Sequence, residues 1–159
     1  MHRLAVTGHR GLDLQTTKAV TREIRAIVAG VDAGDLVGVS CLADGADTIF
    51  AREVLDHGGR LVAIVPAEQY RDGLPDAHHP VYDALLGSAS EVVVLDHVES
   101  TEQAHMDAGL RLLDGADELV AVWDGQPARG VGGTADVVAA AWERSVLVTI
   151  VWPPNARRQ

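Results

Sequence analysis

Leu61-Val62-Ala63-Ile64-Val65 is the stretch that decides the fold, because it is a run of five apolar residues that ends at Pro66. A strand with one face in water alternates apolar and polar residues, whereas this run offers apolar side chains to both faces. Such runs are typical of a parallel sheet that helices cover on both sides. Other short apolar runs predict further strands at residues 4–6, 36–40, 91–95, 118–123 and 146–152.

Longer amphipathic segments separate these strands. They predict helices at residues 13–29, 46–57, 101–113 and 133–144, and a short helix at 81–86 within an irregular stretch. Strands that alternate with helices through right-handed crossovers predict an α/β fold: a Rossmann-like, doubly wound parallel sheet in a three-layer α/β/α arrangement. The 159 residues fit a single domain at 1–154, followed by a flexible tail at 155–159.

The chain is acidic, with 13 Lys and Arg against 23 Asp and Glu and a formal net charge of −10. This charge argues against a partner of duplex nucleic acid, which needs a basic face. It still allows a small anion, because a few amides at a helix N-terminus can hold a phosphate. The single cysteine, Cys41, excludes an internal disulfide and indicates a reducing compartment. Without a signal peptide or an apolar run long enough to span a bilayer, we expect a cytoplasmic protein with no membrane partner.

Ligands of open parallel sheets bind beyond the carboxyl ends of the strands. The first predicted strand ends in Thr7-Gly8-His9-Arg10. Gly8 allows a close backbone approach, Thr7 offers a hydroxyl, and Arg10 suits bidentate contact with phosphate. The alternative is an ordinary strand–helix turn with a solvated arginine. His9 could contact the ligand or could be a hydrogen-bonded structural histidine.

The second strand is followed by Asp44-Gly45-Ala46-Asp47. Gly45 comes directly before a predicted helix, whose free amides and dipole favour an anion, so Asp44 and Gly45 are candidate ligand contacts. Asp47 lies in the first helical turn. It could contact a ribose hydroxyl, serve as a catalytic carboxylate, or only stabilise the helix.

The strongest signal follows the fifth strand, where Gly132-Gly133-Thr134 opens a helix. Unencumbered amides, a hydroxyl and the positive helix end then point at one place, which favours phosphate binding. Asp124 and Arg129 in the same loop are further candidate contacts. The alternative is a flexible loop followed by a helix cap.

Several common motifs are missing from the sequence. There is no P-loop, no Gly-x-Gly-x-x-Gly after the first strand, and no Gly-x-Ser-x-Gly elbow. The adjacent His78 and His79 match no strong zinc pattern. We therefore expect neither a metal nor a tightly held cofactor.

Taken together, these segments resemble the SLOG superfamily of Rossmann-like domains, which includes DNA-processing protein A and the "lonely guy" phosphoribohydrolases. The resemblance rests on Thr7-Gly8-His9-Arg10, Ala43-Asp44-Gly45-Ala46-Asp47, Gly59-Arg60-Leu61-Val62-Ala63-Ile64-Val65-Pro66 and Gly132-Gly133-Thr134-Ala135-Asp136. It implies a nucleotide or nucleotide-derived ligand in the glycine-rich loops, and a homo-oligomer, dimer or higher. The relatives that process DNA imply a nucleic-acid role as a further possibility, against which the acidic charge weighs.

The enzymatic branch of this superfamily pairs Pro-Gly-Gly-x-Gly-Thr-x-x-Glu with an arginine on the preceding helix. This chain has Val137 in place of the glutamate and Gly109 in place of the arginine. The nearest carboxylate, Asp136, is one position earlier and points about 100° away on a helix. Two functions therefore stay open. One is a binding protein that senses or processes a nucleotide-derived metabolite. The alternative is an N-glycosidic hydrolase or transferase acting on nucleoside monophosphates, with Asp136 or Asp47 as the catalytic carboxylate.

Overall fold

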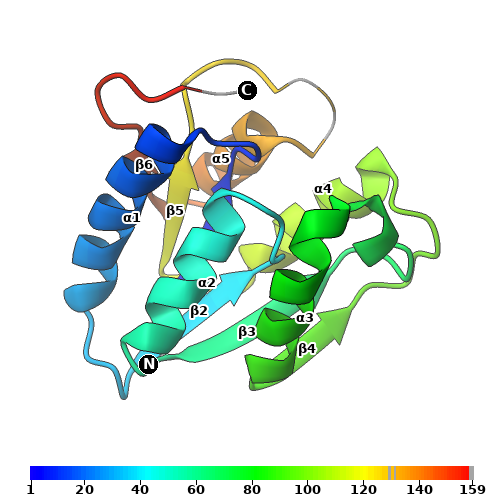
Figure 1. The fold of residues 1–159 in the computed structure, drawn as a ribbon, viewed down its shortest axis with the longest axis horizontal. Helices are drawn as coiled ribbons and strands as arrows, with labels where there is room; N and C mark the ends of the chain where they lie inside the picture. The colour runs from blue at the N-terminus through cyan, green and yellow to red at the C-terminus, as the bar shows by residue number, and fades with distance from the viewer. Residues whose placement is uncertain (129, 131, 158–159) are drawn as a thin grey trace.

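The computed structural model describes residues 1–128, 130 and 132–157. Within them, six parallel strands form one sheet in the order β4-β3-β2-β1-β5-β6 (Figure 1). The strands are β1 (His2–Gly8), β2 (Leu36–Ser40), β3 (Arg60–Val65), β4 (Glu91–Val94), β5 (Glu118–Val122) and β6 (Leu147–Val151). The doubly wound parallel sheet predicted from the apolar runs is therefore confirmed.

Helices cover both faces of the sheet, which gives the three predicted layers. Figure 1 shows α1 (Leu14–Ala29), α2 (Ala46–Asp56) and α3 (His79–Ser88) in front of the sheet, with α4 (Glu102–Leu112) and α5 (Thr134–Glu143) behind it. Short 3₁₀ turns at Arg71–Gly73 and Asp76–His78 lead into α3. In the part of the chain that the structure describes, no helix is both long and apolar enough to cross a membrane.

The central strands β1, β2, β3 and β5 are buried on both sides, as the runs predict, whereas the edge strands β4 and β6 leave several apolar side chains exposed. Leu4 and Val6 of β1 pack in a cluster with residues of α1 and α2, including Phe50. The intervening Ala5 points the other way and joins the cluster under α4 and α5, which includes Val137. Because successive side chains of a strand alternate between faces, one continuous apolar run supplies both cores.

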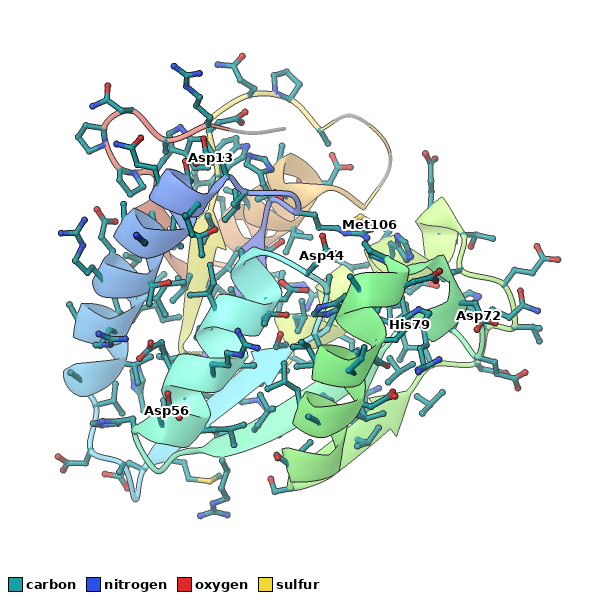
Figure 2. All side chains as sticks on the ribbon, in the orientation of Figure 1. Asp13, Asp44, Asp56, Asp72, His79 and Met106 are labelled. Carbon is teal, nitrogen blue, oxygen red and sulfur yellow. The ribbon has the colours of Figure 1, made fainter. Side chains whose placement is uncertain are left out.

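Two helix starts follow from side-chain caps. The Asp13 carboxylate, at the start of α1 in Figure 2, accepts a hydrogen bond of 2.7 Å from the Thr16 amide. The Thr101 hydroxyl likewise accepts one from the amide of Ala104, at 3.1 Å, and begins α4. In contrast, α3 begins two residues before the predicted helix, since Pro80 is tolerated in a first turn that needs no amide hydrogen.

The connection through α4 creates the crevice in which a ligand can lie. From β1 to β4 the chain adds strands toward one edge of the sheet, and α4 then returns it to β5 on the other side of β1. The strand order therefore reverses between β1 and β5, where open α/β sheets bind ligands beyond the carboxyl ends. Beyond β6, the amide of Arg157 donates a 2.9 Å hydrogen bond to the Thr16 hydroxyl, which connects the last described residues to α1.

Candidate functional site

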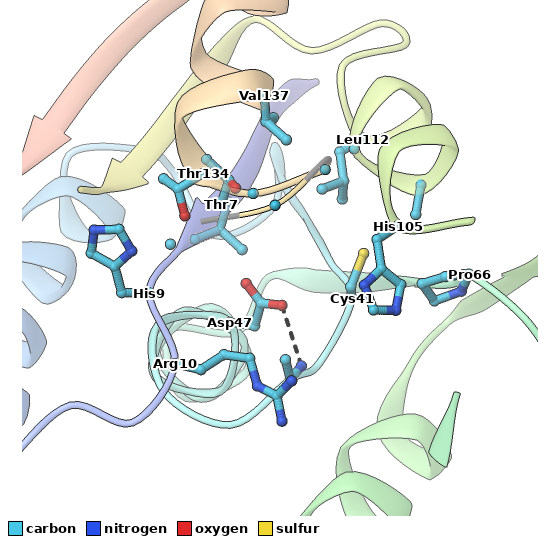
Figure 3. Close-up of a pocket in the computed structure, with 18 of the residues that line it drawn as sticks. Thr7, His9, Arg10, Cys41, Asp47, Pro66, His105, Leu112, Thr134 and Val137 are labelled. Atoms are coloured by element: carbon cyan, nitrogen blue, oxygen red, sulfur yellow. Dashed lines mark hydrogen bonds between the residues drawn. The ribbon is translucent and has the colours of Figure 1, made fainter. Parts of the chain in front are cut away.

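A cavity of about 420 Å³ opens at this reversal point (Figure 3). Its walls come from the end of β1, the segment between β2 and α2, the segment after β3, α4, and the start of α5. Eight of the sequence-predicted residues line it: Thr7, Gly8, His9, Arg10, Asp47, Gly132, Gly133 and Thr134. Loops that are far apart in the sequence therefore meet in one space.

Two glycines bring these loops together. A Cβ atom at Gly8 would lie 2.4 Å from the Cβ of Ala46 and 2.8 Å from that of Val122, so only glycine lets β1 contact both α2 and β5. Gly45 has a φ of +88°, and a Cβ there would lie 2.7 Å from the His9 carbonyl oxygen. Both positions thus serve close backbone approach, which is the role expected for Gly8.

The start of α5 forms the polar wall of the cavity. Its N-cap, Gly133, makes no side-chain capping bond. The Thr7 and Thr134 side chains both line the cavity, and each residue is only 8% exposed. Neither hydroxyl makes a hydrogen bond within residues 1–128, 130 and 132–157. Neither oxygen is a fully buried atom, so both hydroxyls are open to the cavity and can bond a polar ligand there.

His9 connects three segments at the edge of the cavity. It is 6% exposed, and its Nε2 lies 3.1 Å from the amide nitrogen of Asp124 and 3.2 Å from the Asp124 carboxylate. Its ring meets Trp152 edge to face at 5.4 Å. His9 thus both lines the cavity and holds the ends of β1, β5 and β6 together.

Arg10 reaches the cavity from the segment after β1. Its Nε donates a 2.8 Å hydrogen bond to the carboxylate of Asp44, in the loop before α2 (Figure 2). The arginine side chain is half-exposed, and Asp44 itself does not line the cavity. Asp44 therefore orients the guanidinium and compensates part of its charge.

Asp47 brings a carboxyl group into the cavity from the first turn of α2 (Figure 3). Its Oδ2 accepts a 3.2 Å hydrogen bond from the amide of Ala43. Desolvation raises the pKa of Asp47 to about 7, although the Ala43 bond and the charge of Arg10 act in the opposite direction. This carboxyl is therefore poised to change its charge near neutral pH.

Sequence reasoning missed three further lining residues, Cys41, Tyr70 and His105. Tyr70 and His105 meet edge to face with ring centroids 5.9 Å apart. Burial raises the pKa values of Cys41 and Tyr70 and lowers that of His105, so all three favour their neutral forms. A signal for His105 was present, since Ala108 and Leu112 follow it on the same helical face and indicate the side that meets the sheet.

Gly109 and Val137, which replace the arginine and glutamate of the enzymatic branch, pack against each other. A Cβ atom at Gly109 would lie only 2.7 Å from Cγ2 of Val137. Both residues are buried and line the cavity. The wall that carries a charged pair in that branch is therefore hydrocarbon in this chain.

Four predicted residues lie outside the cavity wall: Asp44, Gly45, Asp124 and Asp136. The Asp136 carboxylate accepts a 3.0 Å hydrogen bond from the amide of Gly132, and that of Asp124 accepts one of 2.9 Å from the amide of Gln126. Arg129 lies outside the described residues. Among residues 1–128, 130 and 132–157, no group of His, Cys, Asp and Glu could hold a metal ion.

No protein-family model matches the sequence, and no curated protein matches it. The sheet order and the helical layers define a Rossmann-like three-layer α/β/α domain, which is the fold that the resemblance implied. Among solved structures, the chain is similar to DNA processing protein A from Streptococcus pneumoniae, with a TM-score of 0.69 and 19% identity. That match covers 98% of this chain but 52% of the pneumococcal one, so the chain spans about half the length of that protein.

Two further structures show the same fold. DNA processing protein A from Helicobacter pylori, described for its single-stranded DNA binding mode, gives a TM-score of 0.67 at 13% identity and covers 99% of this chain and 68% of its own. The molybdenum cofactor binding protein of the phototrophic bacterium Rippkaea orientalis gives 0.63 at 13% identity, with 96% and 77% covered.

These likenesses correct the expected partners. The sequence favoured a small nucleotide-like molecule and a homo-oligomer, and its acidic charge weighed against nucleic acid. The part of that expectation that set nucleic acid aside was wrong, because two of the similar proteins are DNA processing proteins, while a third is a cofactor binding protein. Net charge is summed over the whole protein and does not give the charge at one binding site. In addition, single-stranded nucleic acid binds partly through stacking of its bases on aromatic side chains, which needs no positive charge.

Proposed function

We propose that this cavity binds the phosphate group of a nucleotide or nucleotide-derived ligand and holds the ligand intact. The observation that carries the proposal is that Thr7 and Thr134 line the cavity at the N-terminus of α5 with hydroxyls that have no hydrogen-bond partner among the described residues. Amides at a helix start and hydroxyl donors are the groups that bind phosphate in proteins of any net charge. Arg10 adds a cation within reach of the same space.

The proposal that the ligand stays intact rests on the remaining carboxylates. Asp136 already accepts a hydrogen bond from its own loop, and Val137 and Gly109 form an apolar contact. N-glycosidic cleavage needs an ionised carboxylate at the sugar to support an oxocarbenium-like transition state or to activate water. Asp47 is the predicted catalytic carboxyl that does line the cavity, but burial raises its pKa to about 7, so near neutral pH much of it is protonated. We therefore favour a sensor or carrier of the ligand over a hydrolase.

Calorimetric titration tests the binding. The probes are inorganic phosphate and the four common ribonucleoside 5′-monophosphates. We expect binding tighter than millimolar for at least one nucleotide, and a loss of about tenfold in Thr134→Val, which keeps the volume but removes the hydroxyl. Thr21→Val is the matched control, because that hydroxyl donates to the Thr17 carbonyl within α1 and Thr21 does not line the cavity. Failure of every probe to bind would overturn the proposal.

Chromatography of the same nucleotides after incubation tests whether they stay intact. We expect no free base above the rate without protein. Release of base that Asp136→Ala or Asp47→Asn abolishes would instead favour the N-glycosidic hydrolase.

A second candidate is a nucleotide unit within a single DNA strand, which the likeness to the DNA processing proteins favours. This candidate predicts that a labelled oligo-dT binds at low salt and is released as salt rises. The same Thr134→Val substitution would weaken that binding. If free nucleotides bind while oligo-dT does not, this second candidate is excluded.

A further inference from the structure

The cavity has a second polar group of side chains, Asp47 and Tyr70, besides the hydroxyls at the start of α5. Tyr70 lies in the segment after β3, lines the cavity, and is 6% exposed. Its hydroxyl makes no hydrogen bond within the described part of the chain. Asp47 faces the same space, and of its two oxygens only Oδ2 accepts a hydrogen bond from those residues, the one from Ala43.

The two side chains have complementary hydrogen-bonding chemistry. A carboxylate accepts hydrogen bonds, whereas a phenol hydroxyl can donate one. Burial raises the pKa of the Tyr70 phenol, and the charges of Cys41 and Asp47 act in the same direction, so the phenol stays protonated and can donate. A sugar hydroxyl both donates and accepts, so an acceptor beside a donor is the pairing that it needs.

The charges around Asp47 and Tyr70 disfavour an anionic part of the ligand at this position. Asp47 and Glu102 both line the cavity, and Arg10, the one Lys or Arg side chain that lines it among the described residues, is already paired with Asp44. A second phosphate here would therefore meet carboxylates with little compensating charge. Burial keeps the neighbouring His105 neutral by lowering its pKa, so it adds no attraction for an anion. A neutral, hydroxyl-rich group fits these surroundings best.

We propose that Asp47 and Tyr70 bind the vicinal hydroxyls of a ribose whose phosphate lies at the start of α5, so that the site selects ribonucleotides over 2′-deoxyribonucleotides. This inference rests on the proposed phosphate site and names the sugar that goes with it. It also predicts that free ribonucleotides bind better than a DNA strand.

The test compares ribose 5-phosphate with 2-deoxyribose 5-phosphate by calorimetry, because these probes carry the sugar and the phosphate without a base. We expect the ribose compound to bind about tenfold more tightly, the effect of one hydrogen bond to a charged group. Tyr70→Phe and Asp47→Asn should each reduce that ratio toward one. The affinity for inorganic phosphate should stay unchanged in Tyr70→Phe and should not fall in Asp47→Asn, which removes a negative charge from the cavity. Tyr82→Phe is the control, since Tyr82 is a buried neighbour of Tyr70 that does not line the cavity.

The outcomes separate the two proposals. Equal affinity for the two sugars, or a ratio that persists in both variants, would overturn the ribose inference and leave the phosphate site standing. Failure of inorganic phosphate, sugar phosphates and nucleotides to bind would overturn the phosphate site itself, and this inference with it. Thermal melting of each variant shows whether a lost ratio reflects unfolding instead of a lost contact.

Discussion

The Asp47 carboxyl destabilises the folded protein at neutral pH, because burial raises its pKa from 3.8 to about 7. Between about pH 4 and pH 7 the unfolded chain has released this proton while the folded chain keeps it, so stability falls as pH rises. We expect Asp47→Asn to raise the free energy of unfolding by roughly 2–4 kcal/mol at pH 8, and by little at pH 4. Urea unfolding at the two pH values measures this difference.

The control for that experiment is Asp72→Asn, on an exposed turn. The groups that surround Asp47 and could also titrate or change its charge are Arg10, Asp44, Cys41 and Tyr70. An equal gain in unfolding free energy from Asp47→Asn at both pH values would show that relief of packing strain causes the effect, and not the raised pKa of Asp47. Functional sites often contain ionisable groups that lower the stability of the folded protein.

The contact of Gly109 with Val137 yields a second prediction at this scale. Glycine-to-alanine changes inside helices usually stabilise, but a Cβ at Gly109 would lie 2.7 Å from Val137. We expect Gly109→Ala to cost about 1–3 kcal/mol of unfolding free energy through overpacking. Adding Val137→Ala should recover part of the loss, as a double-mutant cycle would measure.

Gly87→Ala in α3 is the matched control, because open space surrounds the position that its Cβ would take. It should stabilise the protein by about 0.5–1 kcal/mol. If Gly109→Ala stabilised the protein as well, the overpacking prediction would be wrong, because α4 and α5 would then have adjusted to accept the added methyl group.

At the scale of elements, the Thr101 cap sets where α4 begins and thereby helps to place His105. The Thr101 hydroxyl accepts from the Ala104 amide, so Thr101→Ala removes one capping bond. We expect a loss of about 1 kcal/mol in unfolding free energy, and Thr101→Ser should retain most of the stability. Denaturant unfolding of the two variants checks this, and equal losses would contradict the capping role.

The sequence predicted the elements well wherever local chemistry determines them. The strand Leu36–Ser40 has its predicted ends, and α1 and α4 begin beside their predicted caps. The cavity wall was predicted only in part. The helical face shared with Ala108 and Leu112 indicates that His105 faces the sheet, but no local pattern encodes the crossover that brings α4 to the cavity. Asp124 and Asp136 matched the expected residue types but bond to amides of their own loop, and spacing alone does not reveal such side-chain directions.

At the scale of the whole molecule, the net charge of −10 produces repulsion among surface carboxylates. Salt screens this repulsion, so the melting temperature should rise when NaCl is raised from about 10 to 200 mM. Differential scanning calorimetry measures the rise. Glu23, Glu68 and Glu99 are exposed, and changing all three to glutamine should make the rise smaller. A melting temperature that falls with salt would mean that attractive ion pairs outweigh the repulsion.

The return of the chain through α4 has a mechanical consequence. The segments after β1 and β2 form one wall of the cavity, while α4 and the start of α5 form the opposite one. A ligand bound between these walls would contact segments that are far apart in the sequence. Such contacts stabilise the packing of the layers against each other more than they stabilise the end of a single helix. Occupancy would then protect the domain against proteases as a unit.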